Sequence, residues 1–188
     1  MSESEDRILA ARVLGGDKNA FGALAAKHRD AMYSFALRML GDREQAYDAA
    51  QETFIRAYTR LDTFDQSRRF RSWLFAIAAN ICTDLLRRRG KPSISLDDGP
   101  PIGVTAGDEA SPSDAIEKRE LQRTVAAALQ HLDQAERTVV ILKHIHGFTY
   151  EEISEMTGMP MGTVKSHAHR ARRKLAELLA HVERGDAR

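Results

Sequence analysis

Hydrophobic residues recur every three or four positions along most of the chain, which is the period of an α-helix. One stripe in the first half consists of Phe21, Leu24, His28, Met32, Phe35 and Met39. Similar stripes follow at 46–61 and 70–85, and the last ends in three arginines and Gly90, a pattern typical of a helix end. No segment alternates as a half-buried strand would. The pattern therefore predicts an all-α protein.

The second half contains a predicted helix-turn-helix. Thr149 followed by Glu152 forms a capping box at the start of a helix expected over 150–157. Gly158 can end this helix with a positive φ, and Pro160 is suited to the first turn of the next one. A helix, a glycine turn and a second helix form the DNA-binding arrangement.

Prolines and glycines concentrate between the two helical regions. Four of the five prolines lie within 90–115, with four glycines and no aromatic residue. This composition predicts a linker at 91–115 between two small helical domains, 1–90 and 116–188.

Charge is distributed unevenly although the total is nearly balanced. The 188 residues carry 28 Lys and Arg against 27 Asp and Glu. The segment 91–115 contains one basic residue, Lys91, and five acidic residues, whereas 160–175 contains five Lys or Arg and no acidic residue. The acidic linker can be a solvated segment or can bind a partner. The basic helix has the electrostatic character of a nucleic-acid contact.

The spacing of the second helix separates a core face from a DNA face. Val164, Ala168, Ala171 and Leu175 share the inward side. Near the helix start, the side chains expected to reach base edges are Lys165, Ser166, His169 and Arg170. Those expected to contact phosphates are Thr149, Tyr150, Thr163, Arg172 and Arg173. The alternative is a solvated amphipathic helix, but such helices usually mix charge signs for i, i+4 pairing.

A second candidate DNA surface lies in the first domain, where aromatic residues alternate with arginines over 64–73. Phe70 and Trp73 also fit the core stripe of the following helix, so we interpret them as core. The preceding loop is expected to touch DNA, since cationic and aromatic side chains together hold a backbone and unstacked bases. The candidates are Phe64, Arg68, Arg69 and Arg71.

Little in the sequence suggests an enzyme. His144 and His146, like His167 and His169, are two residues apart, so a helix directs each pair to different sides and neither chelates one metal. No phosphate loop, zinc-protease motif or nucleophile elbow occurs. We expect no metal and no cofactor. The single cysteine, Cys82, is interpreted as a core residue.

The sequence predicts a cytoplasmic protein. Met1 to Asp6 contains three acidic residues and no apolar run, so no signal peptide is expected. No stretch has the roughly 18 apolar residues of a membrane-spanning helix.

Several separated motifs together resemble the extracytoplasmic-function (ECF) sigma factors of bacterial RNA polymerase. They are DAAQETF at 48–54, FRSWL at 70–74 followed by Asn80, YEEI at 150–153 and GTVKS at 162–166. Their order and spacing agree with that family from about residue 20 to residue 180.

The resemblance implies a promoter-specific initiation factor whose first domain recognises and melts the minus-10 element and whose second reads the minus-35 element. The exposed face of Asp48, Gln51 and Glu52 would bind the clamp of the polymerase's largest subunit. The second domain would bind the flap of the second-largest subunit. The acidic linker would run near the template strand, and an anti-sigma factor would control the protein.

The resemblance also implies roles for residues of the first domain. The loop 63–69 would capture a flipped base, which costs a few kcal/mol. Residues that would lie near the minus-10 DNA are Asn80, Asp84, Arg87 and Arg88.

The main alternative is a conventional helix-turn-helix regulator that binds duplex DNA as a dimer. Such a regulator needs neither the face formed by Gln51 and Glu52 nor the aromatic and basic loop.

Overall fold

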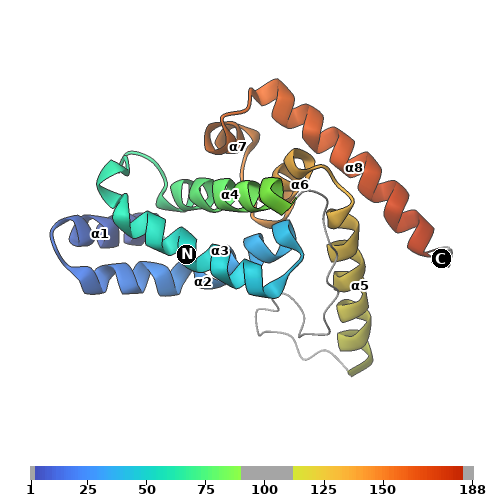
Figure 1. Ribbon diagram of the computed structural model, residues 1–188, viewed down its shortest axis with the longest axis horizontal. Coiled ribbons are helices and arrows are strands. Elements are labelled where there is room, and N and C mark those ends of the chain that lie inside the picture. The colour runs from blue at the N-terminus through green and yellow to red at the C-terminus, as the bar shows by residue number, and fades with distance from the viewer. Residues whose placement is uncertain (1–2, 90–111, 184–188) are drawn as a thin grey trace.

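The computed structural model describes residues 3–89 and 112–183, and within these ranges the regular structure is entirely helical. This confirms the all-α prediction. Figure 1 shows the arrangement of the elements, which are α1 (Glu3–Leu14), α2 (Lys18–Leu40), α3 (Arg43–Thr59), η1 (Leu61–Thr63), α4 (Phe70–Arg89), α5 (Pro112–Gln130), α6 (Gln134–Val140), η2 (Ile141–Ile145), α7 (Tyr150–Thr157) and α8 (Met161–Glu183).

The first half is a helical bundle in which α2, α3 and α4 pack together. Asp17 and Asp42 cap the starts of α2 and α3, since their carboxylates accept backbone N–H groups. The predicted stripes of α2, α3 and α4 lie largely in the core. On α3 the buried positions are mostly alanines, so the neighbouring helices approach closely.

Gly41 ends α2 at a point where only glycine fits well. Its φ is +69°, a left-handed conformation that side chains disfavour. A Cβ here would also lie 2.9 Å from Cδ of Gln130 in α5. Gly41 therefore allows the end of α2 to approach the second half of the chain.

The second half begins with α5 at Pro112, inside the segment predicted to be a linker. The rest of that segment, 91–111, lies outside the described residues. After α6 the chain continues through the π-helical turn η2, and α7 and α8 follow. In Figure 1, α8 is a long rod on the outer side of this half.

The two halves share one hydrophobic core. The ring of Phe148 lies 5.0 Å from that of Phe75, centre to centre, and both side chains are buried. Arg137 donates a hydrogen bond of 2.5 Å to the Met39 carbonyl, and Gln130 Nε2 donates one of 3.0 Å to the Arg38 carbonyl. The sequence left the relative placement of the halves open, and the structure packs them directly together.

Candidate nucleic-acid interface

The helix-turn-helix forms as predicted. Thr149 Oγ1 accepts the Glu152 backbone N–H at 3.1 Å, and the Glu152 carboxylate accepts that of Thr149 at 2.8 Å. Gly158 has a φ of +69° at the end of α7. Pro160 lies just before α8, and its carbonyl accepts the N–H groups of Thr163 and Val164. These caps set the turn between the two helices.

Helix α8 presents the face that its spacing predicts. Val164, Ala168 and Ala171 are fully buried, and Leu175 packs partly against the core. Tyr150 is half-buried, with Lys143 Nζ 4.7 Å from its ring centre. The other predicted contacts are exposed: Thr149, Thr163, Lys165, Ser166, His169, Arg170, Arg172 and Arg173. Their roles on DNA remain predictions, but the structure brings them to one side of α8 and to the start of α7.

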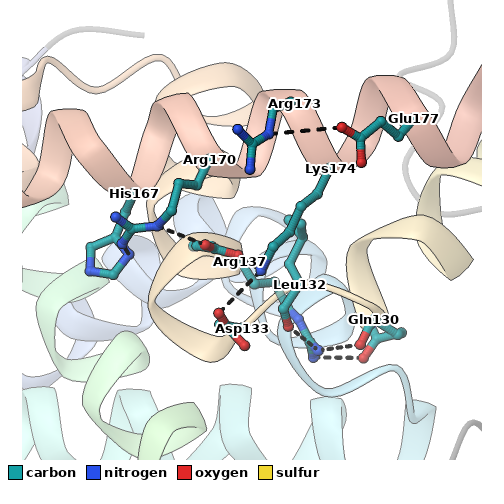
Figure 2. Close-up of polar contacts among 10 residues, drawn as sticks. Gln130, Leu132, Asp133, Arg137, His167, Arg170, Arg173, Lys174 and Glu177 are labelled. Carbon is teal, nitrogen blue, oxygen red and sulfur yellow. Dashed lines mark hydrogen bonds and ion pairs between the residues drawn. The ribbon is translucent and has the colours of Figure 1, made fainter.

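Arg170 and Lys174 of α8 have acidic partners outside the helix, which its local sequence does not reveal, and Arg173 has one within the helix. Arg170 Nε lies 3.1 Å from Oε1 of Glu136 in α6, and Lys174 Nζ lies 2.7 Å from Oε2 of the same carboxylate. Figure 2 shows Lys174 directed toward Asp133 and Arg173 toward Glu177, at 3.2 and 3.8 Å. The local charge count therefore overstates the free positive charge of the helix.

Phe64 corrects the sequence interpretation. We expected this residue to contact DNA, but it is only 6% exposed. Its ring packs against those of Phe70 and Trp73, at centroid distances of 5.5 and 5.2 Å. Phe64 is a core residue that anchors the loop, whereas the polar residues after it are exposed.

Arg71 is engaged between the two halves in this arrangement. Its guanidinium donates a 2.7 Å hydrogen bond to the His146 carbonyl and lies 4.4 Å from the centre of the Phe148 ring. Arg71 is half-buried and joins the two halves, so in this arrangement it does not face DNA.

Arg68 and Arg69 are exposed but face the helix-turn-helix. Arg69 Nη1 lies 3.1 Å from Oε1 of Glu152, and Arg68 Nη1 lies 3.6 Å from Oε2 of Glu155. Arg69 Nε also pairs with Glu3 at 3.1 Å. Two predicted minus-10 contacts are therefore paired with the first helix of the predicted minus-35 reader.

The remaining minus-10 candidates lie farther along α4. Asn80, Arg87 and Arg88 are exposed, and Asp84 is half-buried and accepts a 2.9 Å hydrogen bond from Arg87. Their spacing places them on one side of the helix. The structure does not bring them to the loop at 64–69, because the start of α4 lies between.

The predicted polymerase-binding face of α3 contains apolar residues that the sequence reasoning missed. Asp48 and Gln51 are exposed, while Glu52 is half-buried and pairs with Arg56 at 2.6 Å. The missed residues are Tyr47 and Ile55, each 58% exposed. The buried stripe of alanines was the available signal, since large apolar residues outside it must face outward.

Tyr58 belongs to the hydrophobic stripe at 46–61, which was expected to lie in the core. It is instead 42% exposed and contacts Phe21 at the bundle edge, with ring centres 5.0 Å apart. Cys82, by contrast, is confirmed as a core residue, and burial raises the pKa of its thiol to about 12.

Two further features of the described residues bear on other kinds of site. Within 3–89 and 112–183, no three His, Cys, Asp or Glu side chains are placed to hold a metal ion. None of the helices in these ranges is long and apolar enough to cross a membrane.

The sequence matches two family models. Residues 24–91 match sigma-70 region 2, and residues 122–175 match sigma-70 region 4. The first match covers α3 and α4, and the second covers the helix-turn-helix.

Curated relatives match along almost their whole length. The ECF RNA polymerase sigma factor SigW of Bacillus subtilis is 37% identical over 177 residues, which cover 89% of this chain and 93% of SigW. The sigma factor CnrH of Cupriavidus metallidurans is 38% identical over 183 residues, covering 94% and 95%.

Solved structures share the fold as well. CnrH in complex with the cytosolic domain of CnrY aligns with a TM-score of 0.70 and 32% identity, covering 94% of this chain and 97% of CnrH. The sigma factor RpoE of Bartonella quintana, in complex with the anti-sigma factor NepR, aligns with a TM-score of 0.69 and 28% identity, covering 85% and 96%.

Proposed function

Because this chain belongs to the ECF sigma factors of bacterial RNA polymerase, we propose that it docks on core polymerase through α3 and contacts both promoter elements. The minus-10 contacts are the exposed residues of the loop at 63–69, which exclude Phe64, and the polar side of α4. The minus-35 contacts are α8 and the start of α7. One observation carries this proposal. The same chain contains a match to sigma-70 region 2 and a capped helix-turn-helix, and the outward face of α8 in that motif is basic.

The proposed division of labour follows the predicted boundaries. Residues 1–90 bind the clamp of the largest subunit and melt the minus-10 element. Residues 116–188 bind the flap of the second-largest subunit and read the minus-35 element. The segment 91–115 connects them within the polymerase. The direct packing of the two halves means that this division requires them to separate on the enzyme.

Helix α3 has the composition of a docking surface. Tyr47, Gln51, Ile55 and Tyr58 are exposed and follow helical spacing along one side, next to Asp48. Apolar and aromatic residues surrounded by polar ones are typical of protein interfaces. We therefore include Tyr47 and Ile55 in the proposed polymerase contact.

Ile55→Glu is expected to weaken binding to core polymerase by about tenfold or more, because a charge would be buried at the interface without a partner. Ile55 is 58% exposed, so the fold should not change. The measurement is fluorescence anisotropy of labelled protein titrated with core polymerase. The matched control is Ile8→Glu, which introduces the same charge at a residue 61% exposed on α1. Equal affinities for both variants and the wild type would refute the docking surface.

A regulatory partner is part of the proposal. CnrH is solved with the cytosolic domain of CnrY, and RpoE with the anti-sigma factor NepR. By analogy, an anti-sigma factor binds this chain and controls its access to polymerase. The site of action is the cytoplasm, where polymerase works, and the chain acts as an initiation factor rather than as an enzyme.

Reconstituted transcription tests the proposal. Purified protein and core polymerase, without another sigma factor, are incubated with genomic DNA of the bacterium that encodes the chain, and transcript 5′ ends are sequenced. Start sites that share two upstream elements support the proposal. No specific start sites, together with tight palindromic duplex binding by the protein alone, would instead identify a conventional helix-turn-helix regulator.

A further inference from the structure

Glu136 is a buried carboxylate beneath α8. It lies in the first turn of α6, and its side chain is only 1% exposed. Its two oxygens are divided between two cations of α8, Arg170 at 3.1 Å and Lys174 at 2.7 Å. Burial acts to raise the pKa of Glu136, but hydrogen bonds from Lys174 and Arg170 outweigh it and hold that pKa below its ordinary value. The carboxylate is therefore ionised at neutral pH.

The contact fixes one edge of the Arg170 guanidinium. Nε donates to Glu136 Oε1, and Nη2 lies 2.9 Å from His167 Nδ1, so both contacts fall along the same edge of the planar fork. Figure 2 shows Arg170 extended between α8 and the helix below it, beside His167. Among the described residues, Nη1 has no hydrogen-bond partner, and the side chain is 46% exposed. The end edge of the fork, formed by Nη1 and the second N–H of Nη2, thus has no partner among the described residues.

An accessible end edge is what base recognition requires. Guanine presents O6 and N7 in the major groove, and two parallel N–H groups of an arginine contact them together. A side chain that is already held loses less rotamer freedom on binding. We propose, resting on the function proposed above, that Glu136 is a positioning residue for minus-35 recognition, which holds Arg170 so that its free edge reads a guanine.

Glu136 has a second effect through Lys174. Together with Asp133, it keeps this ammonium paired inside the protein, at 2.7 and 3.2 Å. A paired lysine contributes less to phosphate attraction, which is the sequence-independent part of DNA binding. The carboxylate of Glu136 therefore favours discrimination between base sequences over non-specific affinity for DNA.

The test uses Glu136→Gln in reconstituted holoenzyme. The probe is a promoter identified in the transcription experiment, prepared as a library in which the upstream element is randomised. The transcript yield of each library member gives the base preference at each position of that element. We expect Glu136→Gln to lower the preference for one G·C pair by about tenfold, because one bidentate contact accounts for a factor of this order. On non-specific duplex DNA the free variant should bind more tightly, with the slope of log K against log salt steeper by about 1.

Three variants make the result specific. Arg170→Ala should lose the preference for G·C at the same base pair. The double variant Arg170→Ala with Glu136→Gln should then show the same base preference as Arg170→Ala alone. Glu177→Gln removes an exposed carboxylate that pairs with Arg173 on the same helix, and should keep the wild-type preference. Lys174→Met should keep it as well, since the pair of Arg170 and Glu136 stays intact.

The outcomes separate this inference from the proposed function. If the wild-type holoenzyme shows no base preference in the upstream element, the proposed function fails. If the wild type discriminates but Glu136→Gln matches it, or Arg170→Ala has no effect, the role of Glu136 is overturned. Thermal unfolding checks that each variant folds. If Glu136→Gln does not fold, Glu136→Met is used in its place, since the two cations that it leaves without a carboxylate, Arg170 and Lys174, are 46% and 37% exposed and can be solvated by water.

Discussion

Replacing Arg137 with alanine is expected to lower the free energy of unfolding by about 3 to 5 kcal/mol, the range for removing one partner of a buried charged contact. Arg137 is 3% exposed and lies among carbonyl oxygens at the ends of two helices. It donates to the Met39 carbonyl at 2.5 Å, to the side chain and backbone of Gln130 at 2.6 and 2.8 Å, and to the Leu132 carbonyl at 3.2 Å.

The cost is large because alanine would leave several buried acceptors without donors and would remove a bridge between the two halves. Burial lowers the pKa of Arg137 to about 10, so the guanidinium still carries its charge at neutral pH. The partial negative charge at the carbonyl ends of helices stabilises that cation without a carboxylate.

Urea unfolding followed by circular dichroism measures the effect. Arg137→Lys keeps the charge but cannot donate in several fixed directions, so an intermediate loss is expected. The matched control is Arg173→Ala, which removes an exposed arginine with a loose pair to Glu177, and should change stability by no more than about 0.5 kcal/mol. A loss below about 1 kcal/mol for Arg137→Ala would show that the buried contacts do not hold the halves together.

Acidification from pH 7 to pH 5 is expected to destabilise the protein by about 2 kcal/mol through His146 alone. Its ring centre lies 4.6 Å from that of Phe75, and no hydrogen-bond partner for its buried Nε2 occurs within 3–89 and 112–183. Burial lowers the pKa of His146 to about 3, and Arg71 and Arg38 contribute in the same direction.

The sign follows from proton uptake by the unfolded chain. Unfolded His146 binds a proton near its ordinary pKa of 6.5, whereas the folded side chain stays neutral down to about pH 3. The free energy of unfolding therefore falls as the pH drops below 6.5, with a slope that approaches about 1.4 kcal/mol per pH unit. Above that pH, His146 has little effect.

Unfolding midpoints at several pH values test this dependence. His146→Phe fills similar space without titrating and should remove about 2 kcal/mol of the loss between pH 7 and pH 5. Burial also lowers the pKa of His28 and His144, but these residues are present in both proteins and cancel in the difference. His131→Gln, at an exposed position, should behave like the wild type. Parallel pH profiles for wild type and His146→Phe would refute the assignment.

The helix-turn-helix could be predicted from sequence because its signals are local. The hydroxyl of Thr149, the carboxylate of Glu152 and the conformation of Gly158 act within a few residues of each other. The inward stripe of α8 depends only on helical spacing. Both predictions were confirmed by the structure.

The errors concern contacts that no helical period reveals. Phe64 lies in a short irregular loop, where no period shows that its ring packs against Phe70. Arg71 reads as a surface cation until His146 and Phe148 fold against it. Glu136 sits 34 positions before Arg170, so no local rule pairs them. Packing between the two halves decided the case of Arg71, whereas Phe64 packs within the first half and Glu136 pairs with α8 within the second.

That packing leads to the central claim about function. Arg68 and Arg69 of the predicted minus-10 loop pair with Glu155 and Glu152 of the helix-turn-helix. In this arrangement these two arginines are occupied by contacts with α7. We therefore expect specific promoter binding only when polymerase holds the halves apart. The exposed ion pairs are weak enough to be exchanged, and contacts with polymerase must in addition outweigh the buried packing of Phe75 on Phe148 and the hydrogen bonds of Arg137.

The most direct measurement compares promoter affinity with and without core polymerase. The DNA is a labelled promoter whose start site was identified by reconstituted transcription, and a second DNA has both promoter elements scrambled. Each DNA is titrated with the free protein and, separately, with the holoenzyme. We expect strong discrimination by the holoenzyme and nearly equal, weak binding of both DNAs by the free protein. Tight and specific binding by the free protein would contradict this expectation.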